Sequence, residues 1–409
     1  MHTFLEWEAW LATLDCDDDY GEVLSLFSAP RLGAAYRKRW DSDYLIRLAA
    51  REGSFLTEYR LDPASFDVLV ELLRPTLEVN WGMAALQATR SGSAPISVAS
   101  RVGSSMIVLG GGRHIEAMRT HGISEAQSYK SFRDFVRAVN SHPQLALKFE
   151  TDRDSCARRA ARFQARSQKG LFEYCVGAMD GIAIRMIAPK KRGHIVTNQA
   201  AYFSDSKKAY IHNVLAMCDA DMIFTGMTCI AGGCGNDIDV FARSGWPLTL
   251  QSMPFPYHVV GDGAFSASRV MIPPFPGVNL HQTDPGKDTF NYYQSSTRIV
   301  IECAFGLLVA VFGVFWRPLE YDIDFQPEII HACMRLHNFR RLRGLRHATV
   351  SLSAPPIADV DLTGRLIDDV WRVERAPGRM GGEGNQVRQD ILQTIKDNGY
   401  THSRSHRQN

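Results

Sequence analysis

The sequence predicts a mixed α/β domain that follows an all-helical domain. Between residues 55 and 150, apolar residues recur at the spacing of amphipathic helices. From Leu171 onward, short apolar runs rich in β-forming residues take over, and a helical stretch separates the third run from the fourth. Two of these runs lead into an Asp-Gly pair, at Asp180 and at Asp262. The second domain is therefore expected to carry acidic side chains at the ends of strands.

Length and composition set broad limits on the kind of protein. A chain of 409 residues is long enough for two or three domains with a large core. Lys+Arg 46 against Asp+Glu 44 is nearly balanced, so any interaction with nucleic acid must depend on local charge. We see no apolar run of about 18 residues and no secretory signal, and expect no membrane contact. The eight cysteines form no CxxC pair, which predicts reduced thiols in an intracellular protein and argues against zinc.

The chain is expected to divide into four parts. The last part is largely polar and Gly-rich, which predicts partial disorder with one short helix over Val387–Lys396. The four parts are peripheral N-terminal helices (1–54), a helical domain resembling a helix-turn-helix (55–150), the α/β domain (151–345) and a C-terminal extension (346–409).

Three helices are predicted in the second part, over Ala99–Leu109, Arg113–Thr120 and Glu125–Val139. A Gly-containing turn joins the last two, and Ser124 can cap the third. Two helices joined in this way fit a helix-turn-helix, in which the third helix would face DNA. The alternative is a helical support module with a solvated polar face. The side chains offered to DNA would be Gln127, Ser128, Lys130, Ser131, Arg133 and Arg137.

A strongly basic stretch, Asp152–Lys169, leads into the α/β domain and predicts a helix. Such a stretch is most often a solvated surface. Next to a site that acts on nucleic acid, it would instead follow the phosphate backbone. The residues expected to do so are Arg158, Arg159 and Arg162.

The order of strands in the α/β domain is informative. The first three are expected to pair antiparallel, and the fourth to join after a helical crossover, which demands a mixed sheet. We expect the first strand to end at an exposed Asp180, and a Pro- and Gly-rich loop over 273–286 to precede a helix that carries Glu302. This order is typical of a ribonuclease-H-like fold. The strands are Tyr174–Met186, Lys208–Asp219, Met222–Ile230 and Tyr257–Gly261, with a crossover helix from Asp237 through Phe241.

Two strand-end acids and a helix acid predict a cluster of carboxylates. Hard divalent cations require oxygen ligands of this kind. Clustered carboxylates without a cation repel one another, and one pKa rises. A pair of bound ions supports in-line phosphoryl transfer, so we expect metal-dependent chemistry on nucleic acid. Taken singly, each Asp-Gly pair could be a turn and Glu302 a solvated helix residue.

Six segments in one order resemble the PIF/Harbinger-type transposases and their domesticated nuclease relatives. The resemblance runs from about Leu61 to Phe339. The segments are Gly177-Ala-Met-Asp-Gly181, Asn213-Val-Leu-Ala-Met-Cys-Asp219, Gly235-Asn-Asp-Ile-Asp-Val-Phe241, Val260-Gly-Asp262, Arg298-Ile-Val-Ile-Glu-Cys-Ala-Phe-Gly306 and Leu336-His-Asn-Phe339.

The resemblance implies a DDE endonuclease or transposase in which Asp180, Asp262 and Glu302 are catalytic. The same three acids would hold two Mg²⁺ or Mn²⁺ ions, and Asp180 would bridge them. Asp237 matches a further family acid, which would be an accessory metal ligand or a helix cap. The resemblance also implies DNA as substrate, residence in the nucleus, a Myb-like DNA-binding partner protein, and possible oligomers.

The surroundings of the acids depart from the family pattern. Ile182 and Ala183 stand where the family has small polar residues and a histidine. After the Glu302 helix the family has basic residues, whereas this chain is apolar over 307–312. Fewer positive charges would weaken binding to DNA. A second hypothesis is therefore a domesticated DNA-binding protein with little or no cleavage activity.

Overall fold

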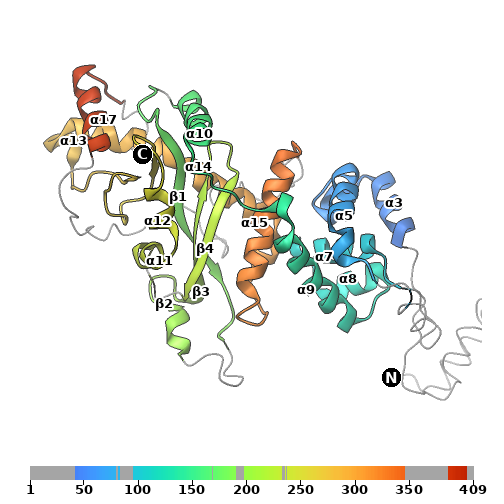
Figure 1. Cartoon of the computed structure of the whole chain (residues 1–409). Helices are drawn as coiled ribbons and strands as arrows, with labels where there is room; N and C mark the ends of the chain where they lie inside the picture. Colours follow the sequence, from blue (N-terminus) through green and yellow to red (C-terminus); the bar gives the residue numbers. More distant parts are fainter. Residues whose placement is uncertain are drawn as a thin grey trace, which may run out of the picture.

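The computed structural model describes residues 42–79, 82, 95–167, 169–189, 198–232, 235, 237–345 and 386–402 (Figure 1). The expected N-terminal helices of residues 1–54 fall largely outside these residues, and α3 (Ser42–Glu52) is the described part. Much of the C-terminal extension also lies outside them. Its predicted helix is present as α17 (Gln386–Asp397).

Among the described residues, five helices follow α3 in the N-terminal domain. The caps that the sequence predicts are present: the Asp62 carboxylate accepts the Ser65 N–H at 2.9 Å, and Ser124 Oγ accepts the Gln127 N–H at 3.2 Å. Gly122 ends the second helix of the predicted trio at a φ of 58°. The helices are α4 (Phe55–Tyr59), α5 (Pro63–Leu77), α7 (Val98–Leu109), α8 (His114–His121) and α9 (Glu125–Ser141).

A mixed sheet forms the centre of the second domain. β1 pairs antiparallel with β3, which pairs antiparallel with β4, while β5 joins β1 in parallel and β6 joins β5 in parallel. The predicted pairing of the four main strands is confirmed. The strands are β1 (Cys175–Arg185), β2 (Phe203–Ser204), β3 (Ala209–Cys218), β4 (Phe224–Gly232), β5 (His258–Val260) and β6 (Met271–Ile272).

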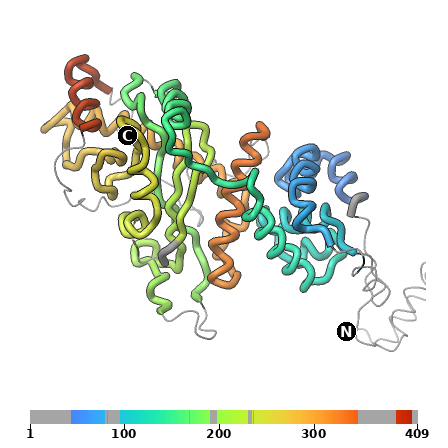
Figure 2. Tube along the Cα trace, in the orientation of Figure 1, coloured from blue at the N-terminus to red at the C-terminus, as the bar shows by residue number. Residues whose placement is uncertain are grey.

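Helices cover both faces of this sheet. Successive side chains of a strand point to opposite faces, so alternate residues of one strand pack against different helices. In β3, Val214, Ala216 and Cys218 belong to the larger core, which lies beneath α14 (Pro285–Val311) and α15 (Gln326–Leu342). The alternating Leu215 and Met217 belong to a second core with α10 (Arg153–Arg166), α11 (Asp237–Arg243) and α12 (Trp246–Gln251). The result is a three-layered α/β domain (Figure 2).

The helix that carries Glu302 is longer than the sequence predicted. α14 begins at Pro285, inside the stretch expected to be a loop, and follows the one-turn helix α13 (Leu280–Thr283). Asp284 caps it by accepting the Lys287 N–H at 3.2 Å, and Pro285 fills the first helical position. By length and composition alone α14 could cross a membrane. It packs on β1 and β3, however, as a core helix of this domain.

The C-terminal helix α17 packs against α14 (Figure 1). The Arg388 guanidinium lies 3.7 Å from the centroid of the Phe275 ring and donates to the Pro274 carbonyl at 3.1 Å. Beyond the helix, the His402 ring stacks on Tyr292 of α14 with 4.6 Å between ring centroids. The end of the described chain is therefore fastened to the helix that carries Glu302.

Candidate metal centre

Asp180 lies in the middle of β1 rather than at its end. The strand continues to Arg185, and Asp180 is paired with Ala216 of β3. The predicted strand end with an exposed acid is wrong here, because pairing with β3 extends past the Asp-Gly pair, and Arg298 of α14 lies against the carboxylate. Asp180 is 7% exposed. Its Oδ1 accepts the Gly181 N–H at 2.9 Å.

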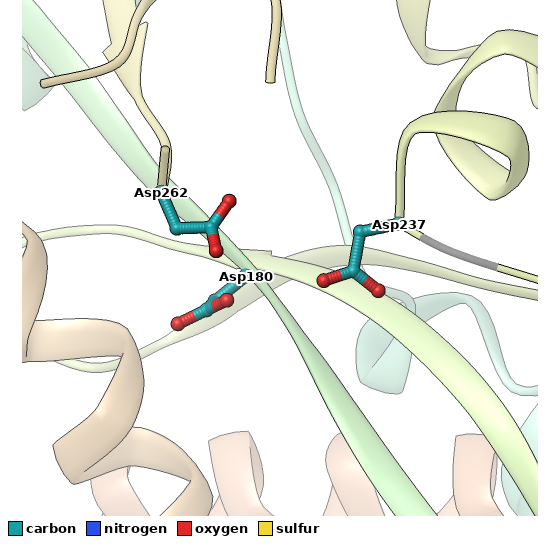
Figure 3. A group of neighbouring side chains, drawn as sticks. All are labelled: Asp180, Asp237 and Asp262. Carbon is teal, nitrogen blue, oxygen red and sulfur yellow. The ribbon is translucent and has the colours of Figure 1, made fainter. Parts of the chain in front are cut away.

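Three aspartates from distant parts of the chain converge at this point (Figure 3). Asp180 comes from β1, Asp237 is the first residue of α11, and Asp262 follows β5. One carboxylate oxygen from each lies within 4.8 Å of the others. Asp180 is buried and the other two are half-buried. An all-oxygen set of three carboxylates fits a hard divalent ion such as Mg²⁺ or Mn²⁺.

Gly181 makes room for this convergence. A Cβ at position 181 would lie 2.5 Å from Asp237 Oδ1 and 2.8 Å from Asp237 Oδ2. Any side chain at this position would displace the Asp237 carboxylate. The glycine is thus required by a close approach within a strand and not by a turn.

Asn213 holds the Asp237 carboxylate from the neighbouring strand β3. Its Nδ2 donates to Asp237 Oδ1 and to the Gly235 carbonyl, both at 2.9 Å. The sequence placed Asn213 in a motif without giving it a role. Asp237 itself, expected to be accessory, lies within the aspartate cluster.

Glu302 lies outside the cluster of three aspartates, on α14. The Arg298 guanidinium connects the two, donating one N–H to Asp180 Oδ2 and pairing through its other terminal nitrogen with Glu302 Oε1. Arg298 and Glu302 are four residues apart on one helix, which brings their side chains together. The side chain of Arg298 is 17% exposed and that of Glu302 is 38% exposed. The Arg-to-Glu spacing was the signal in the sequence that could have identified Arg298.

Burial dominates the electrostatics of the centre. It raises the pKa of Asp180 from 3.8 to about 7; Arg298 opposes the rise, and Asp262 and Asp237 add to it. Burial also raises the pKa of Asp237, against the hydrogen bond from Asn213. The pKa of Arg298 is raised although burial lowers it, because Asp180 and Glu302 stabilise its charge. A divalent cation would offset the repulsion among these acids.

The α9 residues that the sequence predicted to contact DNA differ in exposure and in the contacts that they make. Arg133 donates to the Asp322 carboxylate at 3.1 Å and lies 4.6 Å from the Phe325 ring centroid. Arg137 lies 3.6 Å from the Glu328 carboxylate of α15, whereas Lys130 is exposed. Ser128 and Ser131 were predicted to be available to DNA, and this is wrong. Both are buried, because their side of α9 packs into the helical domain.

The basic face of α10 is exposed in part and makes contacts within the protein. Arg158 donates to Ser155 Oγ at 2.7 Å. Arg159 donates to the Glu150 carbonyl and lies 4.5 Å from the Phe149 ring centroid, and Arg162 pairs with Asp221. DNA contacts by these arginines and by Lys130, Arg133 and Arg137 stay a prediction.

A comparison with known protein families gives one match. Residues 179–338 match the family model described as DDE superfamily endonuclease. No curated protein and no solved structure matches the chain. The matched segment contains the three clustered aspartates, Glu302 and Arg298. The α/β domain is thus similar to DDE superfamily endonucleases, and a divalent metal and a DNA substrate are implied by that similarity.

Proposed function

From the similarity of residues 179–338 to DDE superfamily endonucleases, we propose that this protein is a metal-dependent DNA endonuclease or transposase. The observation that carries the proposal is the cluster of Asp180, Asp237 and Asp262, with oxygens within 4.8 Å of one another inside the matched segment. Such a cluster is costly without a cation, since desolvation and mutual repulsion both oppose its ionisation.

The residues of the centre would have distinct roles in holding the metal and in catalysis. Asp180, Asp237 and Asp262 would hold Mg²⁺ or Mn²⁺, and Asn213 fixes the orientation of the Asp237 carboxylate. Glu302 would complete the catalytic set from the side of α14. When bound, the metal supplies a Lewis acid that lowers the pKa of a hydroxyl nucleophile and stabilises the leaving oxygen. The buried strand β1 keeps the central carboxylate rigid between these groups.

The finer assignment is also a proposal. The six sequence motifs from Gly177 to Phe339 favour the PIF/Harbinger type, with the nucleus as its site of action and a Myb-like protein as a DNA-binding partner. Contacts to DNA would come from Lys130, Arg133 and Arg137 of α9, and from Arg158, Arg159 and Arg162 of α10. An oligomer would fit an enzyme that handles two DNA ends.

The alternative is a domesticated DNA-binding protein without cleavage. What favours it is the surroundings of the acids: the two side chains after Gly181 are Ile182 and Ala183, and the last turns of α14 are apolar. Binding to DNA through the basic helices would then remain, and the aspartate cluster would be a remnant.

Nicking of supercoiled plasmid by the purified protein tests the first proposal. The assay is run with Mg²⁺, Mn²⁺ or EDTA, beside Asp180→Asn and Asp262→Asn. Each variant is expected to lose activity by about a hundredfold or more. Asp205→Asn is a matched control, because Asp205 is 93% exposed on its side chain and makes only a 3.9 Å contact with Lys208. DNA binding without any metal-dependent nicking would favour the alternative, and nicking that survives both variants would refute the site.

A further inference from the structure

We propose that Arg298 occupies the second of two cation positions in this centre. The free protein then accepts one divalent ion, among the three aspartates, and a second ion only after Arg298 leaves. The inference depends on the proposed function, because it concerns the same metal centre. It assigns to Arg298 a role in controlling how many ions the centre holds.

The guanidinium of Arg298 lies between two acids that come from different elements. Arg298 contacts Asp180 Oδ2 and Glu302 Oε1 with its two terminal nitrogens. A cation that bridges one carboxylate of the cluster to the remaining acid is placed as a second metal ion would be. The guanidinium fork matches paired carboxylate oxygens, which explains why an arginine can hold this place.

Asp180 takes part in two groupings of charge. It supplies an oxygen to the cluster with Asp237 and Asp262, and its carboxylate also accepts a hydrogen bond from Arg298. Glu302 does not belong to the group of described residues whose oxygens converge within 4.8 Å. The three aspartates thus offer one position for a metal ion. The position between Asp180 and Glu302 is already occupied by the positive charge of Arg298.

Arg298 has to move rather than lose its charge. A guanidinium stays protonated at any ordinary pH. Removing it without replacement would leave the buried Asp180 carboxylate uncompensated. Exchange for a divalent ion keeps a positive charge beside the carboxylate. Ile299, the next residue of α14, is 50% exposed, so the helix is open to solvent beside Arg298.

Counting bound Mn²⁺ tests this directly without any catalytic assay. Mn²⁺ alone is titrated into the full-length protein in the absence of DNA, and free Mn²⁺ is followed by electron paramagnetic resonance. The wild type is expected to bind one ion at the centre, and Arg298→Gln two. Arg298→Gln/Glu302→Gln, which removes both the guanidinium and the acid opposite it, is expected to return to one. Arg74→Gln is the matched control, because Arg74 forms a 2.5 Å pair with Glu71 on the exposed surface of α5.

Each outcome decides something. One ion in both wild type and Arg298→Gln, with the same affinity, overturns the inference and leaves the proposed function standing. Two ions in the wild type also overturn it. Failure of every variant to bind Mn²⁺ removes the metal centre and with it the proposed function. If Arg298→Gln does not fold, Arg298→Lys replaces it: a single ammonium cannot bridge both acids, so a second, weaker ion is expected, and its absence refutes the inference.

Discussion

The acidic residues around β1 and the basic residues of α9 and α10 differ in how their charges are compensated. Among the described residues, three aspartates converge with one guanidinium beside them. The arginines on the two helices instead reach carboxylates, carbonyls or rings of the same chain, as Arg133 and Arg159 do. Uncompensated buried charge marks a functional site more reliably than a run of charges in sequence. The comparison therefore favours the metal centre over the basic helices as the better supported part of the proposed function.

Among changes that leave every acid in place, the largest effect is expected from Gly181→Ala, which tests whether the three aspartates act together as a metal centre. The new Cβ would push the Asp237 carboxylate away, and metal affinity and DNA nicking should fall by roughly 10- to 100-fold. Gly245→Ala is the control, because a Cβ there meets nothing within 4 Å. Calorimetric titration with Mg²⁺ measures the affinity. Unchanged affinity in Gly181→Ala would mean that Asp237 is not a ligand.

The second prediction concerns pH in the absence of metal. The pKa of Asp180 is raised to about 7 in the folded protein, so the folded state binds a proton that the unfolded state has lost. The free energy of unfolding should therefore decrease as pH rises from about 4 to about 7, by up to a few kcal/mol. Urea unfolding in EDTA across this range measures the slope. Asp180→Asn should flatten it, and an equal slope in that variant would contradict the prediction.

A smaller effect is expected from Asn213→Ala. This change removes both hydrogen bonds from β3 to the Asp237 side of the centre, which should weaken Mg²⁺ binding by about tenfold and lower stability by about 1 kcal/mol. Calorimetric titration and urea unfolding report the two effects separately. A loss of stability without a change in Mg²⁺ affinity would give Asn213 a purely structural role.

The smallest effects are expected from substitutions in α9. Arg133 and Lys130, three residues apart, test whether the basic helices bind DNA. Arg133→Gln removes the pair with Asp322 and the contact with Phe325, and should lower stability by about 0.5–1 kcal/mol. Lys130→Gln should leave stability unchanged and weaken DNA binding, which fluorescence anisotropy with a labelled duplex measures. If neither variant changes DNA affinity, α9 serves as the support helix considered as the alternative.

The sequence predicted the order and pairing of the main strands because each run is long, apolar and bounded by polar turns. It also identified the acids that now cluster, since Asp180 and Asp262 stand in patterned surroundings. It misjudged the exposure of Asp180, because burial of this carboxylate depends on side chains that reach β1 from distant parts of the chain, such as Arg298 of α14. It missed the start of α14, although Asp284-Pro285 is a helix-start signal, because the surrounding Pro- and Gly-rich composition predicts a loop.

The attachment of α17 to α14 has a practical consequence for how the protein is handled. Arg388 and His402 anchor the last described residues to Phe275 and Tyr292, on and beside the helix that carries Arg298 and Glu302. A chain shortened before Gln386 would lose these contacts and expose the apolar side of α14 against which α17 packs. Shortened chains intended for work on the metal centre should therefore retain α17. Comparing the Mg²⁺ affinity of chains with and without α17 would show whether packing against α14 affects the centre.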